Sequence, residues 1–275
     1  MIKLIAMDMD GTLLNDDHAT ISQRNLDALH AAAERGIEVV IASGRTWSLL
    51  EYIARNIGVV RYVLISNGAA ILDLETGEWV LQVGMPEQQV LEFIRVLDDH
   101  DTPFELFCEG TAYMERKYQE RAMQYVLSPA YGQLFRERMT LVDDLAPAIA
   151  GRTVEKIHVF HVEPEEREIL TKALQAVGPF ESACAYAANM EITSPDADKG
   201  RALSVLCRRL GIDASEVMAF GDADNDLGML SWAGWSFAMG NGTDKAKAAA
   251  KYVTGLNSDS GVAQSVERYT LGQQN

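Results

Sequence analysis

Short apolar runs alternate with amphipathic segments in the first part of this chain. Residues 4–7, 37–42 and 62–66 are runs of the kind found in strands buried on both faces of a parallel sheet. Residues 21–35 and 46–57 lie between these runs and carry leucine, isoleucine and alanine at helical spacing. The order strand, helix, strand, helix, strand predicts a parallel sheet with right-handed crossovers.

The same alternation returns in the last part of the chain. Before it, residues 70–74 and 79–83 predict a hairpin around the turn at 75–77. From residue 190 onward the pattern predicts helices at 200–210, 225–233 and 244–251, and strands at 217–221 and 235–239. We therefore assign residues 1–83 and 190–275 to a single core domain.

The middle of the chain, residues 84–189, has a different organisation. Its pattern predicts a helix at 86–99, extended segments at 104–108, 112–115 and 154–162, a helix at 164–176, and an extended segment at 182–187. The expected fold class is therefore α/β, with a Rossmann-like parallel-sheet core and an inserted α+β cap domain. His158 and His161 would point to opposite faces of a strand, so they are not expected to form a metal pair.

Composition excludes several classes of protein. The chain has 275 residues, 48% hydrophobic and 23% charged, which is typical of globular domains with real cores. A net charge of −16 argues against general nucleic-acid binding, which depends on basic patches. The apolar runs are shorter than the roughly 18 residues of a membrane helix, and Asp8 and Asp10 interrupt the apolar stretch that a signal peptide would need. We therefore expect a cytoplasmic protein without nucleic-acid or membrane partners.

Cysteine content and charge also bear on the chemistry. Cys108, Cys184 and Cys207 are odd in number and widely spaced, so neither a disulfide framework nor a zinc ribbon is indicated, and reduced thiols are expected. The negative net charge is unfavourable to any anionic substrate. Such a substrate would need a metal ion or a few lysines and arginines concentrated at its site.

Residues 3–14, KLIAMDMDGTLL, place two acids at the end of the first apolar run. Ligands of open α/β sheets bind outside the carboxyl ends of the strands, so Asp8 and Asp10 are candidates for chemistry. Gly11 permits a sharp turn, and Thr12 adds a hydroxyl. A calcium loop is the alternative for an Asp-rich turn, but an EF-hand requires further oxygen ligands, a closing glutamate and flanking helices.

Three later stretches share this position relative to predicted strands and helices. SGR at 43–45 follows the second strand, where a hydroxyl and the amides of a helix start can hold a phosphate oxygen. Lys199 begins a predicted helix, and taken alone it would be an ordinary surface lysine. GDADND at 221–226 ends a strand with acids and an amide; Asp222 is the stronger candidate for a metal ligand, and helix capping explains the neighbouring residues equally well.

Together and in this order, the four stretches resemble the signature motifs of the haloacid dehalogenase superfamily of phosphohydrolases. The matching motifs are DMDGT at 8–12, SGR at 43–45, KG at 199–200 and GDADND at 221–226. Likeness to the Cof-type subgroup is carried by NGA at 67–69, EI at 191–192, and the closing segments AMGNGTDKAKAAAKYVT and DSGVA. Ser260 is a small departure outside the signature motifs, because these relatives often have glycine joined directly to the acid. The cap matches in size and element order only.

The resemblance implies a Mg²⁺-dependent phosphomonoester hydrolase. Asp8 would be the nucleophile that forms an aspartyl phosphate, and Asp10 would be the acid and then the base. Mg²⁺ would be held by Asp8, Asp222 and the main-chain carbonyl of Asp10. Asp226 would orient these groups without binding the metal directly. The phosphate would be bound by the Met9 amide, Ser43, the Gly44 amide, Lys199 and Asn225.

A small phosphorylated metabolite is the expected partner, and a sugar phosphate or similar polyol phosphate is the expected substrate. A phosphomutase and a phosphatase for a phosphorylated cofactor, such as a flavin or pyridoxal phosphate, are the enzymatic alternatives. A phosphoacceptor receiver domain would be much shorter and would lack a cap, and a silent binding protein would not need intact motifs. Specificity is expected to lie between residues 84 and 189; the sequence leaves the substrate and the oligomeric state open.

Overall fold

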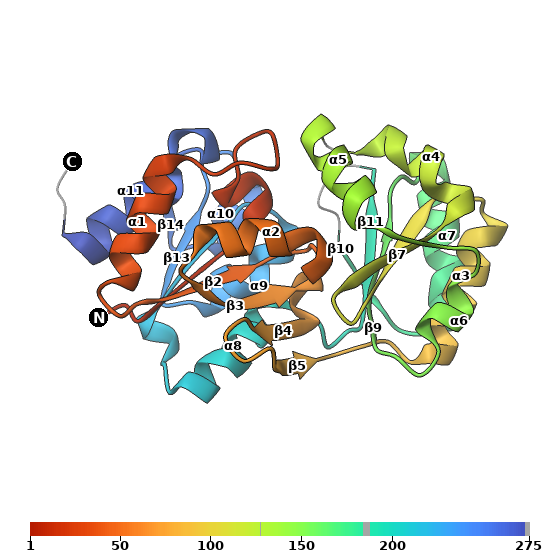
Figure 1. The fold of residues 1–275 in the computed structure, drawn as a ribbon, viewed down its shortest axis with the longest axis horizontal. Helices are drawn as coiled ribbons and strands as arrows, with labels where there is room; N and C mark the ends of the chain where they lie inside the picture. Colours follow the sequence, from red (N-terminus) through yellow and green to blue (C-terminus); the bar gives the residue numbers. More distant parts are fainter. Residues whose placement is uncertain (127, 184–187, 273–275) are drawn as a thin grey trace.

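Two β-sheets lie side by side in the computed structural model, which describes residues 1–126, 128–183 and 188–272. One sheet has eight strands and the other six, and each carries its own helices (Figure 1). The expected α/β fold class, with a parallel-sheet core and an α+β insertion, is confirmed. Among the described residues, no helix is both long enough and apolar enough to cross a membrane.

The eight-stranded sheet of the core has the first strand of the chain near its centre. Its strands are β1 (Leu4–Met7), β2 (Glu38–Ala42), β3 (Val60–Ile65), β4 (Ala70–Asp73), β5 (Trp79–Gln82), β12 (Val217–Gly221), β13 (Trp235–Ala238) and β14 (Tyr252–Val253). The order is β14-β13-β12-β1-β2-β3-β4-β5, and β1 pairs in parallel with both β12 and β2. The hairpin β4–β5 closes one edge in antiparallel register. The carboxyl ends of β12, β1 and β2 therefore meet at one edge of the sheet.

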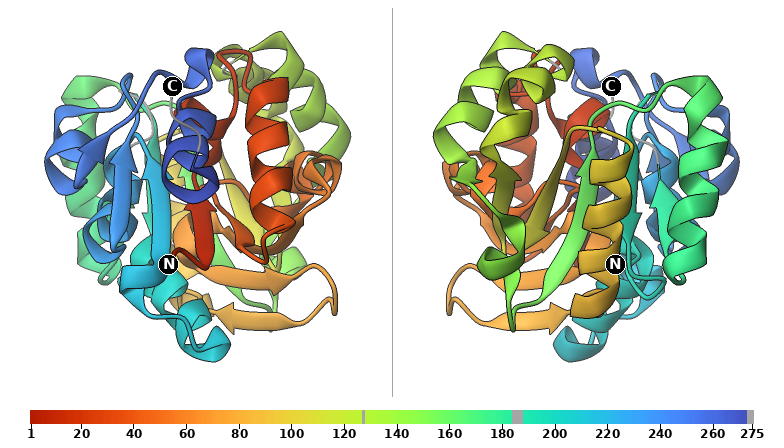
Figure 2. Two further views of the ribbon diagram at one scale, coloured as in Figure 1. Left: turned by 90° about the vertical axis from the view of Figure 1, so that its left-hand side faces the viewer. Right: turned by 90° about the vertical axis from the view of Figure 1, so that its right-hand side faces the viewer.

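Helices cover both faces of this sheet (Figure 2). They are α1 (Gln23–Ala33), α2 (Trp47–Ile57), α8 (Lys199–Leu210), α9 (Leu227–Trp232), α10 (Asp244–Ala249) and α11 (Gly261–Val266). Ile5 and Met7 of β1 share a core with α1, α2 and α11, whereas Leu4 and Ala6 share one with α8 and α9. Side chains alternate across a strand, so a central strand covered on both faces is apolar at every position.

The six-stranded sheet belongs to the inserted cap. Its strands are β6 (Phe104–Cys108), β7 (Thr111–Glu115), β8 (Thr140–Val142), β9 (Val154–Val159), β10 (Glu181–Ala183) and β11 (Met190–Thr193), in the order β10-β11-β9-β6-β7-β8. Two helices, α3 (Glu87–Asp99) and α7 (Pro164–Val177), pack on its apolar face. The opposite face is turned toward the core (Figure 1). Polar side chains on that face are therefore available to a site between the two sheets.

The chain returns to the core later than residue 190, where the sequence analysis placed the change. Met190–Thr193 forms β11, which pairs with β9 and β10 in the cap sheet. Met190 and Ile192 pack into the cap core, and the alternating polar residues Glu191 and Thr193 point to the other face of the sheet. A short alternating segment carries no signal that says which of two sheets it will join. We propose that the second crossing between the domains lies at residues 194–198.

Several other elements differ from the sequence prediction. The expected strand at 154–162 ends at Val159, and α9 begins at Leu227 after a 3₁₀ turn over Asp224–Asp226. No elements were predicted for the segment that forms α4 (Gln119–Ala122), α5 (Pro129–Arg138), β8 and α6 (Leu145–Ile149). α5 buries only Gly132 and Phe135, so its apolar periodicity is too weak to reveal a helix. The predicted extended segment at 182–187 overlaps β10, and its residues 184–187, including Cys184, lie outside the described residues.

Helices α8 and α9 approach so closely that neither tolerates a side chain at the crossing. A Cβ atom added to Gly200 would lie 2.4 Å from the carbonyl oxygen of Gly228. The preceding residue, Lys199, begins α8 and is completely buried. The close approach of the two helices at Gly200 therefore determines how near Lys199 lies to the carboxyl ends of the strands.

We expect Gly200→Ala to lower the free energy of unfolding by about 1–3 kcal/mol, because backbone atoms cannot yield to the added methyl group. Urea denaturation followed by circular dichroism measures this change. Ser204→Ala, on the outer side of the same helix, is the control and should change stability by less than about 0.5 kcal/mol. Equal stability of the two variants would contradict the close-packing account.

Candidate active site

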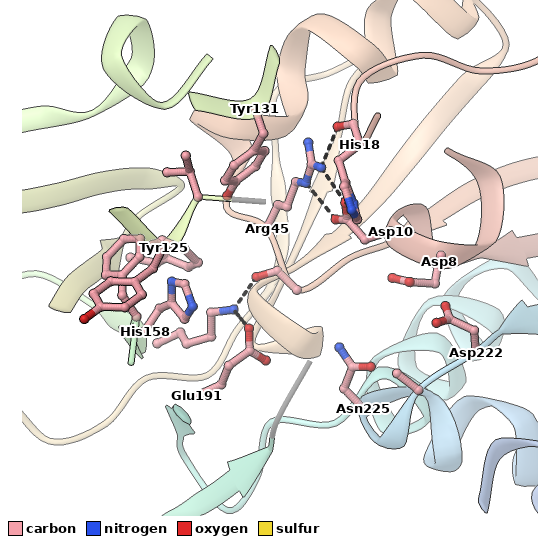
Figure 3. A pocket seen from close by; sticks show the side chains of 17 residues that line it. Asp8, Asp10, His18, Arg45, Tyr125, Tyr131, His158, Glu191, Asp222 and Asn225 are labelled. Atoms are coloured by element: carbon pink, nitrogen blue, oxygen red, sulfur yellow. Dashed lines mark hydrogen bonds and ion pairs between the residues drawn. The ribbon is translucent and has the colours of Figure 1, made fainter. Parts of the chain in front are cut away.

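A cavity of about 290 Å³ opens where the carboxyl ends of the core strands face the cap sheet (Figure 3). Of the residues predicted from the sequence, five line it directly: Asp8, Asp10, Gly44, Asp222 and Asn225. Ser43 and Lys199 lie buried beside it, and Met9 begins the tight turn that follows β1. The structure therefore brings the four motifs together, although they span more than 200 residues of sequence.

Lys199 is the cation at the centre of the site. Its side chain has no exposed surface, and its Nζ lies 2.7 Å from Asp8 Oδ1 and 2.7 Å from Asp226 Oδ1. Burial acts to lower the pKa of Lys199, but Asp226 and Asp8 together raise it above its ordinary value. Lys199 is therefore charged, and it is a buried lysine of the candidate site rather than a solvated surface lysine.

One lysine does not neutralise the carboxylates gathered around it. Burial raises the pKa of Asp8 well above its ordinary value; Lys199 opposes this rise, while Asp226 and Asp222 add to it. The two partners of this ion pair thus differ in their surroundings. Lys199 has two carboxylates beside it, whereas Asp8 shares its one lysine with Asp226 and has two acidic neighbours. A further cation is needed if Asp8 is to stay ionised.

Asp222 approaches Asp8 from the end of β12. Its Oδ1 accepts a hydrogen bond of 2.8 Å from Thr12 Oγ1, which ties the first motif to the last. A Cβ atom at Gly11, where φ is +75°, would lie 2.4 Å from Asp222 Oδ2, so only glycine permits this contact. Burial, together with the charge of Asp226, raises the pKa of Asp222 to about 7.

The acids fit a hard divalent cation. Asp8, Asp222 and Asp226 each offer an oxygen, and these oxygens lie within 4.8 Å of one another. Asp226 is already engaged, because its Oδ2 accepts hydrogen bonds from the amides of Asp222 (2.9 Å) and Ala223 (3.1 Å), and its Oδ1 accepts one from Lys199. Asp8 and Asp222 are therefore the better ligands, and Asp226 suits an orienting role. The Asp10 carbonyl as a ligand stays a prediction.

Asp10 is held in an ion pair that the sequence did not suggest. Arg45 donates from Nε to Asp10 Oδ2 (2.8 Å) and from Nη2 to Asp10 Oδ1 (2.5 Å), and His18 Nδ1 lies 2.9 Å from Asp10 Oδ1. Burial would raise the pKa of Asp10, but Arg45 and His18 hold it well below its ordinary value. Asp10 is therefore ionised in this arrangement. The arginine was visible in the SGR motif, whereas His18 carried no sequence signal.

The side chains predicted to bind phosphate have defined hydrogen-bond partners. Ser43 is buried and its Oγ accepts a hydrogen bond of 3.1 Å from the Arg45 amide, which leaves the hydroxyl hydrogen free to donate elsewhere. Asn225 Nδ2 donates to Asn67 Oδ1 at 3.1 Å, while Asn225 Oδ1 is buried and has no hydrogen-bond partner among the residues that the structure describes. The amides of Met9 and Gly44 as phosphate donors stay predictions.

The cap contributes a face of the site for which no residues were predicted. Lys156, a buried residue of β9, donates from Nζ to Glu191 Oε1 (2.7 Å) and to the Gly44 carbonyl (2.5 Å). His158 lies two residues further along the same strand and also lines the cavity. His161 follows the strand and stacks on Tyr125 instead, with ring centroids 4.6 Å apart. The sequence shows that alternate residues of β9 share a face, but it does not show which of the two faces is turned toward the core.

Comparisons with known proteins agree with this geometry. A family model described as haloacid dehalogenase-like hydrolase matches residues 5–266. The chain is 30% identical to the phosphatase YwpJ of Bacillus subtilis, over 95% of this chain and 98% of that one. It is 28% identical to the 5-amino-6-(5-phospho-D-ribitylamino)uracil phosphatase YcsE of the same organism, over 98% and 96%. A solved haloacid dehalogenase-like hydrolase from B. subtilis superposes with a TM-score of 0.85 at 28% identity, over 98% of this chain and all of that one.

The raised pKa of Asp222 predicts a pH-dependent stability. The group has a pKa of about 7 in the folded protein against an ordinary 3.8, so the unfolded chain releases this proton first as the pH rises. Its contribution therefore lowers the free energy of unfolding between about pH 4 and pH 7. In a chelator, Asp222→Asn should raise that free energy by roughly 1–3 kcal/mol at pH 8 and by less at pH 5.

Chemical denaturation at both pH values measures the effect. Asp224→Asn is the control, because Asp224 forms a surface ion pair with Lys245 and should show little dependence on pH. A gain from Asp222→Asn that is the same at pH 5 and pH 8 would show that Asp222 does not titrate in this range.

Proposed function

The chain belongs to the haloacid dehalogenase-like hydrolase family, in its Cof-type subgroup, and from this membership and the site we propose a Mg²⁺-dependent phosphomonoester hydrolase that works through an aspartyl phosphate. The family and the phosphatase relatives make the chain a phosphatase. The observation that carries the finer proposal is the buried contact of Asp8 with Lys199, beside Asp222 and at the edge of the phosphate-binding loops.

Asp8 is the proposed nucleophile. One of its oxygens is held by Lys199, so the carboxylate has a fixed orientation at the carboxyl end of β1. In the first step an Asp8 oxygen bonds to phosphorus as the bond to the leaving-group oxygen breaks; in the second, water attacks phosphorus and releases Asp8 with inorganic phosphate. Bound Mg²⁺, held by Asp8 and Asp222, would offset the repulsion between these carboxylates and the phosphoryl oxygens.

Asp10 is the proposed acid and base. It can protonate the leaving alkoxide only in its protonated form, and the ion pair with Arg45 and His18 favours the ionised form. We propose that Asp10 takes up its proton in the substrate complex while it stays beside Arg45. Arg45 is then the residue that sets how readily Asp10 takes up its proton.

A sugar phosphate or similar polyol phosphate remains our proposed substrate. The cap half of the cavity favours a second candidate, a phosphate ester with a ring that is flat and apolar on its faces, because Phe107, Tyr125, Tyr131 and Phe160 line it. The relatives YcsE and YbjI are named as phosphatases for a ribitylaminouracil phosphate. Release of inorganic phosphate from each candidate would exclude a phosphomutase, which releases none.

We also propose a cytoplasmic location. Cys108 and Cys207 are buried free thiols, and burial raises the pKa of each above its ordinary value. Such thiols are typical of proteins that fold in a reducing compartment.

Asp8→Asn should reduce kcat for any accepted phosphate ester by at least about 10³-fold, because the amide is a poor nucleophile and a weaker metal ligand. Phosphate release under saturating Mg²⁺ measures this loss, and circular dichroism checks the fold. Beryllium fluoride should trap the unaltered protein and not the variant. A folded variant that keeps more than a few per cent of kcat would remove Asp8 from covalent catalysis.

Asp10→Asn should slow phosphorylation of Asp8 according to how much the leaving group needs a proton. General acid catalysis contributes roughly 10²–10⁴-fold, so a sugar phosphate should lose far more rate than p-nitrophenyl phosphate, whose leaving group is already stable as an anion. Single-turnover kinetics with both substrates separates this step from dephosphorylation. An equal slowing for both would exclude Asp10 as the acid.

A further inference from the structure

The part of the cavity that faces the cap has basic residues, but each of them contacts a carboxylate. The basic residues in the lining are His18, Arg45, Lys156 and His158. The residues outside the described part of the chain include no lysine, arginine, histidine, aspartate or glutamate. The balance of charge in this part of the site can therefore be read from the described residues.

Lys156 makes two hydrogen bonds within the protein. An ammonium group has three N–H bonds. Its Nζ donates to Glu191 Oε1 and to the Gly44 carbonyl, and it lies 4.7 Å from the centre of the Phe107 ring. Its charge is matched by Glu191, whose pKa is held below its ordinary value: burial alone would raise it, but Lys156 and His158 lower it. Its charge and two of its three N–H bonds are thus taken up by partners in the protein.

Arg45 and His158 are matched in the same way. Arg45 is paired with Asp10 through two nitrogens, and its guanidinium lies over the Tyr131 ring at 4.7 Å. His158 Nδ1 lies 2.7 Å from Oε1 of the buried Glu105. The Nη1 of Arg45 is buried and has no hydrogen-bond partner among the described residues. This nitrogen therefore has an unused donor, in a group whose charge is already balanced.

The geometry points to a substrate whose leaving group is uncharged: a compact group with apolar faces that rests on the aromatic walls and offers a neutral oxygen or nitrogen acceptor to Arg45 Nη1. This inference rests on the proposed function and narrows its substrate class. An anionic leaving group would have to enter a cavity in which every basic residue of the described lining already contacts a carboxylate, and the acids of the site would repel it. Phosphorylated metabolites with a second phosphate or a carboxylate are therefore rejected.

A pair of ligands that differ only in charge tests this. 4-Carbamoylbenzyl phosphate and 4-carboxybenzyl phosphate have nearly the same shape, and the methylene group keeps the two leaving alkoxides similar. The matching benzylphosphonates cannot be hydrolysed and report binding alone. With Mg²⁺ at pH 7.5, we expect calorimetry to give a Kd for the amide phosphonate that is roughly 10-fold to 100-fold lower than for the carboxylate. The kcat/KM values of the two esters should differ in the same direction.

Two variants of the cap pair should move this ratio in opposite directions. Glu191→Gln keeps the shape of the side chain and leaves the charge of Lys156 unmatched, so it should improve carboxylate binding relative to the amide by about 10-fold or more. Lys156→Met leaves the negative charge of Glu191 unmatched, so it should weaken binding of the carboxylate relative to the amide. Thermal unfolding of each variant checks the fold, and if one does not fold, the ligand pair on the unaltered protein still decides.

Each result has a definite meaning. A carboxylate phosphonate that binds as well as the amide, or better, overturns the inference whether or not the esters are hydrolysed. A preference for the amide phosphonate without release of phosphate from either ester would overturn the proposed function and leave the pocket's selectivity standing. If neither phosphonate binds, the kcat/KM ratio of the esters decides, and absence of both binding and turnover overturns the inference too.

Discussion

The contact of Lys199 with two buried carboxylates is the constraint on which the rest of the site depends. Asp8 and Asp226 would repel one another at the end of the sheet, and a buried pair that loses one partner is destabilised by roughly 3–5 kcal/mol. Lys199 can reach both because α8 approaches α9 within the space left by Gly200 and Gly228. The packing of two helices on the sheet therefore determines the electrostatics at its edge.

The remaining excess of negative charge explains why the site suits a cation and a phosphate together. Asp222 is brought against Asp8 by the turn at Gly11, and Asp226 uses its oxygens to fix the turn that carries Asp222. These are contacts that raise the energy of the folded chain without a ligand, as functional sites commonly do. In the proposed function, the core supplies the groups that bind the phosphate, and the cap faces the rest of the substrate.

Cap and core meet at the residues that control Asp10. Ser128, at the start of α5, donates from Oγ to the Asp17 carbonyl at 2.7 Å, and Tyr131 of the same helix lies against Arg45. On the other side, Ser66 of the core donates to the buried Glu155 of β9, and burial raises the pKa of this carboxyl to about 7. The position of the cap is therefore linked to the residues that hold Asp10.

The sequence by itself determined the core fold and the candidate residues at its sheet edge, because both are encoded locally. A strand buried on two faces must be apolar throughout, and a motif at its end places Asp8, Asp10, Ser43 and Asp222 at the same sheet edge whatever else the chain does. Tertiary structure alone decided the rest. Contacts between segments far apart in the chain decided whether Met190–Thr193 joined the cap or the core, which face of β9 turned to the site, and that Arg45 pairs with Asp10. Strand periodicity is identical for either choice of sheet or of face.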